Sequence, residues 1–93
     1  MNAAHRLVQR IVSSLRSSGF ALQLRDEESE LLAPIGASDA ALLTQLDACE
    51  IVFLIAERLD GVGGTVVLLP GEGSDCVADY SSSLESFVGP LLD

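Results

Sequence analysis

The feature that most constrains this chain is a change in the spacing of its apolar residues at Gly19 and again at Pro34. Residues 3–18 carry apolar side chains three and four apart on one side, which predicts a helix. Residues 20–25 alternate apolar and polar side chains, which is the period of a half-buried strand. Gly19 suits the end of the helix, because glycine adopts the left-handed conformation without a steric penalty. We therefore expect a helix followed directly by a strand.

A β-hairpin is predicted to come next. Residues 26–29 are polar and of hairpin length, and extended structure resumes at residues 30–33. Pro34 has no amide hydrogen and biases its predecessor toward extended geometry, so it should end the second strand. Ser38 then stands at the N-cap of a second helix, with Asp39 in the first turn. The sequence thus predicts a sharp corner between a strand and a helix.

The remaining pattern predicts more helix, one further strand and a terminal helix. Apolar residues recur at helical spacing over residues 42–59, as one long helix or as two short helices hinged near Asp47. Cys49 is expected on a face of this helical part. Residues 65–69 are apolar or β-branched, so we expect a strand that is buried on both faces. Residues 82–91 carry a capping-box spacing and one apolar stripe, which predicts a short or kinked terminal helix.

These elements predict a small α+β protein with a single domain over residues 1–93. Residues 8–59 would form an αββαα-like core, and residues 60–93 a strand–helix extension. The hydrophobic fraction of 48% favours a packed core. No apolar run approaches the roughly 20 residues of a membrane helix, and residues 1–16 lack the apolar segment of a signal peptide. We therefore expect a cytoplasmic protein with no membrane partner, either free-standing or part of a longer chain.

Charge is divided unevenly along the chain. Residues 1–25 contain four arginines and no acid, whereas residues 26–93 contain Arg58 and all 14 acidic residues, for a net charge of −9. This excess disfavours direct binding to nucleic acid, which requires clustered cations. The arginine face of the first helix, with Arg6 and Arg10, either pairs with acids of the same chain or meets an acidic partner. The acidity also supports an alternative function, a free-standing acidic inhibitor or nucleic-acid mimic from a phage or mobile element.

Residue types needed for catalysis are scarce. His5 is the only histidine, and no nucleophile with a positioned base is visible, so we expect no enzyme and no catalytic residues. The glycines of residues 61–64 match no phosphate-binding pattern and are interpreted as the end of the preceding helix, so no cofactor is expected. The acidic residues 72–80 lack EF-hand spacing, and no metal site is expected. Cys49 and Cys76 are predicted to be free thiols, with one disulfide as the alternative.

Residues 8–59 resemble the TubC-type amino-terminal docking domains of bacterial nonribosomal peptide and polyketide synthetases. Residues 15–19 match the L-x-x-x-G end of that family's first helix, residues 20–32 its hairpin, and residues 33–37 (Ala-Pro-Ile-Gly-Ala) its strand-to-helix corner. The resemblance implies an αββαα fold. It also implies a noncatalytic role, in which a short motif from the end of a partner subunit adds alongside the second hairpin strand.

The predicted binding site is therefore the free edge of the second hairpin strand. An unpaired edge offers backbone donors and acceptors to an incoming extended segment, and flanking charges select the partner. The predicted partner-binding residues are Arg25, Asp26, Glu27, Glu28, Glu30, Leu31, Leu32 and Ala33. The chain is predicted to be a docking or adaptor module with a protein or peptide partner. A homodimer that pairs residues 65–69 of two copies along a sheet edge is a further alternative.

Overall fold

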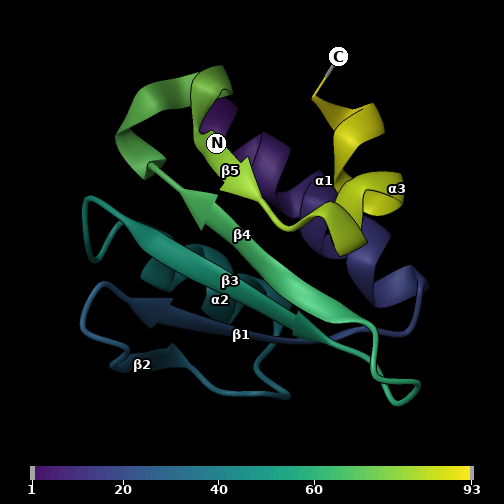
Figure 1. Cartoon of the computed structure of the whole chain (residues 1–93). Helices are drawn as coiled ribbons and strands as arrows, with labels where there is room; N and C mark the ends of the chain where they lie inside the picture. The colour runs from purple at the N-terminus through teal and green to yellow at the C-terminus, as the bar shows by residue number, and fades with distance from the viewer. Residues whose placement is uncertain (1, 93) are drawn as a thin grey trace.

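The computed structural model describes residues 2–92 and contains one five-stranded antiparallel sheet with helices on one side (Figure 1). The strand order is β2-β1-β3-β4-β5. The elements in chain order are α1 (Ala3–Ser17), β1 (Ala21–Asp26), β2 (Leu31–Ala33), α2 (Asp39–Leu46), β3 (Val52–Glu57), β4 (Gly63–Leu68), the 3₁₀ segment η1 (Pro70–Asp75), β5 (Val77–Tyr80), η2 (Ser82–Leu84), α3 (Glu85–Val88) and η3 (Gly89–Leu91). The predicted α+β class is confirmed. None of the helices in residues 2–92 is long and apolar enough to span a membrane.

Both predicted helix starts and the first helix end follow from local capping. The Asn2 side chain accepts a hydrogen bond from the His5 amide (2.8 Å) at the start of α1. Gly19 follows α1 with a φ of 91°, in the left-handed region that glycine tolerates. The Ser38 hydroxyl accepts a hydrogen bond from the Ala41 amide (3.1 Å) at the start of α2. The corner predicted between strand and helix is confirmed.

The β1–β2 hairpin is also confirmed, and its turn depends on Asp26. The Asp26 amide donates to the Glu30 carbonyl (3.0 Å), and the Ser29 amide donates to the Asp26 carbonyl (3.0 Å). The Asp26 carboxylate accepts hydrogen bonds from the amides of Glu28 and Glu30, both at 2.9 Å. Its side chain therefore satisfies backbone donors of the turn, as aspartate commonly does.

The prediction of helix beyond Leu46 is wrong, and so is the last helix of the αββαα pattern. Residues 52–57 form β3, which pairs with β1 on one side and with β4 on the other. Gly61, which the sequence predicts at the end of a helix, lies instead in the turn of the β3–β4 hairpin. Gly61 has a φ of 88°, its amide donates to the Arg58 carbonyl (3.0 Å), and the Arg58 amide donates to the Val62 carbonyl (2.9 Å). Cys49 lies in the connection before β3.

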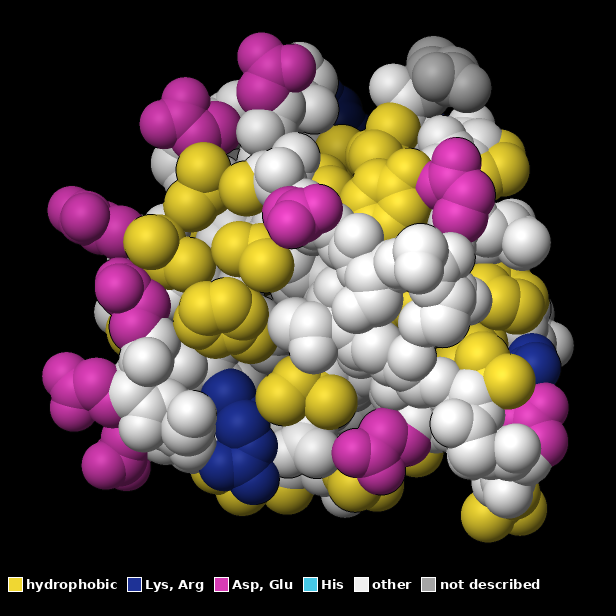
Figure 2. Space-filling view, viewed as in Figure 1, with side chains coloured by type: hydrophobic (Ala, Val, Ile, Leu, Met, Phe, Trp, Pro, Cys, Tyr) yellow, Lys and Arg dark blue, Asp and Glu magenta, His cyan; other side chains and the backbone are white. Residues whose placement is uncertain are grey.

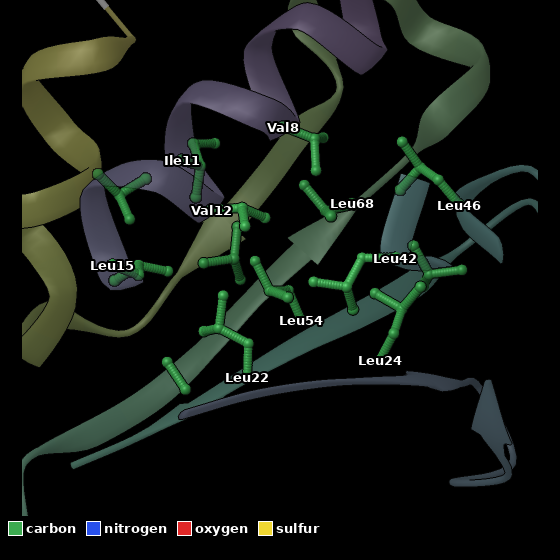
Figure 3. Packing of buried hydrophobic residues seen from close by; sticks show 14 of the residues in the cluster. Val8, Ile11, Val12, Leu15, Leu22, Leu24, Leu42, Leu46, Leu54 and Leu68 are labelled. Carbon is green, nitrogen blue, oxygen red and sulfur yellow. The ribbon is translucent and has the colours of Figure 1, made fainter. Parts of the chain in front are cut away.

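The core lies between the helices and one face of the sheet (Figure 3). Side chains of α1 and α2 meet alternate residues of β1, β3 and β4 there. The labelled members of this cluster are Val8, Ile11, Val12, Leu15, Leu22, Leu24, Leu42, Leu46, Leu54 and Leu68. The carboxyl-terminal elements complete the layer, because Leu84 and Val88 are also fully buried. The predicted extension thus belongs to the same core: β4 joins the hairpin's sheet through β3.

An arginine joins the ends of three elements. The Arg58 guanidinium lies over the rings of Phe20 (4.8 Å) and Phe87 (5.7 Å) and donates to the Ser18 carbonyl (3.2 Å). It also forms two hydrogen bonds with the Asp60 carboxylate, at 3.0 and 2.9 Å. The hydrogen bond from Arg58 lowers the pKa of Asp60, and the same bond raises the pKa of Arg58. The end of α1, the β3–β4 turn and α3 are therefore held together at this point.

Candidate interaction surface

Helices cover only one face of the sheet within the described residues. The buried residues of β3 are Val52, Leu54 and Ala56, every second position. The residues between them project to the opposite face, because successive side chains of a strand alternate in direction. Cross-strand pairing extends this uncovered face over β1, β4 and β5. Figure 1 looks onto it, with α1 and α2 behind the strands.

The centre of the uncovered face is apolar. It carries a set of five residues from β3, β4 and their ends, here called the apolar stripe: Ile51, Phe53, Ile55, Val67 and Leu69. All five are half-buried, yet none belongs to the hydrophobic side chains that pack against the core. The expectation that residues 65–69 are buried on both faces is therefore wrong for this structure. Antiparallel sheets with one solvent-exposed face usually carry polar residues on that face.

A hollow of about 710 Å³ opens at one end of the apolar stripe. It lies between the α2–β3 connection and the start of η1, and Ile51, Leu69 and Pro70 contribute its apolar wall. Asp47, Glu50 and Glu72 line it as well, and no Lys or Arg of the described residues does. We call this feature the acidic hollow.

The acidic hollow belongs to a wider acidic end of the sheet. The register places Asp26 opposite Val52 and Val52 opposite Leu68, so the β1–β2 turn, the α2–β3 connection and η1 meet at the same end. The acids in these three connections include Glu27, Glu28, Glu30, Asp47, Glu50 and Glu72. Figure 2 shows hydrophobic side chains over the strands and acidic side chains along the left margin. The uncovered face therefore combines an apolar centre with one negative end.

β2, the strand predicted to bind the partner, lies at an edge of the sheet. β2 is first in the strand order, and β4 and β5 lie beyond β3 on the other side. Leu31 is 49% exposed, Leu32 packs partly against the core, and Ala33 is buried at 2% exposure. The Ala33 side chain is therefore part of the core. Leu31 stands opposite Arg25, on the uncovered face.

The charged residues predicted to flank that edge divide into two groups. Arg25 and Asp26 are engaged within the hairpin: the Arg25 guanidinium donates to the Gln23 side chain (2.8 Å) and to the Ser29 carbonyl (2.6 Å), and Asp26 caps the turn. The carboxylates of Glu27, Glu28 and Glu30 are exposed. The exposed glutamates can meet a partner without any change in the hairpin.

Three features shorten the edge that β2 offers. The strand has three residues, its pairing with β1 shifts register between Leu24 and Arg25, and Pro34 follows it directly. Short strands, bulges and proline all limit edge-to-edge pairing. The expectation that residues 65–69 form a sheet edge is wrong, because β4 lies between β3 and β5. A homodimer stays a prediction.

The other candidate groups are placed as follows. His5 Nε2 lies 2.8 Å from an oxygen of Asp47, and Arg16 Nε lies 2.7 Å from an oxygen of Asp39. Arg16 of the first helix is thus paired within the chain, whereas no ion pair between described residues involves Arg6 or Arg10. Among residues 2–92, no group of three His, Cys, Asp or Glu side chains is arranged to hold a metal ion. Both cysteines are free; Cys76 is buried, and burial raises the pKa of its thiol.

None of the family models, curated proteins or solved structures compared with this chain matches it. The resemblance to docking domains stays a prediction. Of the fold it implies, the structure contains the first helix, the hairpin and the following helix, with β3 where a further helix was expected.

Proposed function

We propose that this chain is a noncatalytic protein-interaction module that binds its partner on the uncovered face of the sheet. The observation that carries the proposal is the apolar stripe. Its side chains lie on β3, on β4 and at the ends of these strands, but they do not pack against the core. Strands that are apolar on both faces are typical of sheets covered on both sides. A partner on the stripe would supply the second cover and remove this apolar surface from water.

A selection from random 16-residue peptides displayed on phage tests this proposal. The Phe53→Thr, Val67→Thr variant removes apolar contacts of the stripe but keeps side chains suited to strands. The control variant Ile35→Thr, Leu59→Thr removes two exposed apolar residues elsewhere, which are 57% and 107% exposed. Circular dichroism verifies that both variants fold. We expect selected peptides to bind the wild type and the control alike and to bind the stripe variant at least tenfold more weakly. Equal binding to all three proteins would overturn the proposal.

A second candidate mode is the addition of an extended segment to the outer side of β2. It is favoured by the position of β2 at the sheet edge and by the exposure of Leu31. Nuclear magnetic resonance titration with a selected peptide separates the two modes. Shifts concentrated on residues 23–35 would favour the edge, and shifts on β3 and β4 the stripe. Charge reversal at Glu27 and Glu28 should then change which peptides bind without changing stability, because exposed charges act mainly on selectivity.

We also propose a cytoplasmic location. Cys49 and Cys76 are both free thiols, and free thiols persist in the reducing cytosol. Fractionation of cells that express the chain should recover it with cytosolic proteins. Recovery from the medium or from the membrane fraction would contradict this location.

A further inference from the structure

We propose that the apolar stripe and the acidic hollow together bind a cationic amphipathic helix, with apolar side chains on one face and Lys or Arg beside them. This inference rests on the proposed function and adds the chemistry of the partner. The occupant follows from charge complementarity. Asp47, Glu50 and Glu72 line the hollow, and no Lys or Arg of the described residues does. A cation seated there meets the exposed carboxylates of Glu50 and Glu72, and that of Asp47, which also lies 2.8 Å from His5 Nε2, beside an apolar wall. Salt screens the attraction between such exposed charges.

The length of the uncovered face along β3 and β4 fits a helix of moderate length. β3 and β4 each have six residues, which span about 20 Å at the rise of an antiparallel strand. A helix of about 14 residues has the same length at its rise of 1.5 Å per residue. Apolar side chains three and four apart on such a helix would follow the stripe, and a cation near one end would reach the hollow.

Charge argues against a second copy of this chain as the occupant. Each copy has a net charge of −9, so two copies face to face would bring two acidic surfaces together, and like charges across an interface are unfavourable. The exposed arginines Arg6 and Arg10 lie on α1 and not on the uncovered face. Arg25 does lie on that face, opposite Phe53, but its guanidinium is engaged within the hairpin with Gln23 and Ser29. A cationic partner does not meet this repulsion, because its charge is opposite to that of the acidic hollow.

Three synthetic 16-residue peptides test this inference. The first has Leu at helical spacing and Lys on its flanks, the second replaces each Lys with Glu, and the third scrambles the first. Binding is measured by isothermal calorimetry at several salt concentrations. The protein variant Glu50→Gln, Glu72→Gln neutralises the hollow. The matched control Glu57→Gln, Glu85→Gln removes the same charge at the opposite end of β3 and on α3.

We expect the Lys peptide to bind at least tenfold more tightly than the Glu and scrambled peptides. The hollow variant should weaken that binding at least fivefold, the control variant less than twofold, and added salt should weaken it further. Equal binding of the Lys and Glu peptides would overturn the cationic partner while leaving the proposed function intact. If neither the Lys peptide nor the Glu peptide binds while displayed peptides still bind the stripe, the cationic partner is also overturned. A dimer in sedimentation that Phe53→Thr, Val67→Thr dissociates would make a second copy the occupant and overturn the inference.

Discussion

Two neighbouring residues of β3 provide the sharpest test of how the sheet is covered. Leu54 is 1% exposed and stands beside Leu24 and Val66 in the core, whereas Ile55 projects to the uncovered face. Replacing either residue with alanine removes three carbon atoms. At Leu54 the lost transfer free energy is about 2.4 kcal/mol at ~0.8 kcal/mol per carbon, and the cavity raises the total to about 3–4 kcal/mol. At Ile55 we expect about 1 kcal/mol, because shortening a half-buried side chain at the surface of the sheet leaves no closed cavity.

Urea unfolding followed by far-ultraviolet circular dichroism measures both changes in the free energy of unfolding. A difference of about 2 kcal/mol corresponds to roughly 8–16 °C in Tm for a domain of this size. If Leu54→Ala does not fold, the milder Leu54→Val against Ile55→Val keeps the comparison measurable. Equal losses at the two positions would refute the reasoning, because both faces of β3 would then be buried within the chain.

Three further predictions concern single side chains. Burial raises the pKa of the Cys76 thiol. A thiol reagent at neutral pH should therefore modify only Cys49 quickly in the native protein, and both cysteines in denaturant. Fast modification of both cysteines in the native protein would contradict this prediction. Ser29 has a φ of 64°, a conformation that costs a residue other than glycine about 1 kcal/mol. Ser29→Gly should therefore raise the free energy of unfolding by about 0.5 kcal/mol. A decrease in the free energy of unfolding would refute this prediction. Because the Arg58 hydrogen bond lowers the pKa of Asp60, its stabilisation is present above the unfolded-state pKa and lost as the pH falls through the folded-state pKa. Asp60→Asn should therefore lower Tm at pH 7 and much less near pH 2; equal losses would contradict the linkage.

The apolar stripe escaped sequence reasoning because the run Ile51–Ile55 has no period. A run that is apolar at every position fits a buried helix and a buried strand equally well, and its helical interpretation continued the spacing of α2. Two local signals favoured a strand. The run is rich in β-branched and aromatic residues, and Asp60-Gly61 between two apolar segments is a strong hairpin signal. With these residues in a strand, the alternation of side chains would have divided them between two faces.

Local patterns in the sequence by themselves determined α1, the β1–β2 hairpin, the corner at Pro34 and the cap at Ser38, because each depends on backbone geometry and hydrogen bonds within a few residues. Only the tertiary structure decided that β3 lies between β1 and β4, and that helices cover one face of the sheet. The acidic connections meet at one end for the same reason: the register brings Asp26, Val52 and Leu68 side by side from distant parts of the chain. Strand order depends on long-range pairing and on which apolar faces are buried together, and no spacing of neighbouring residues encodes that choice.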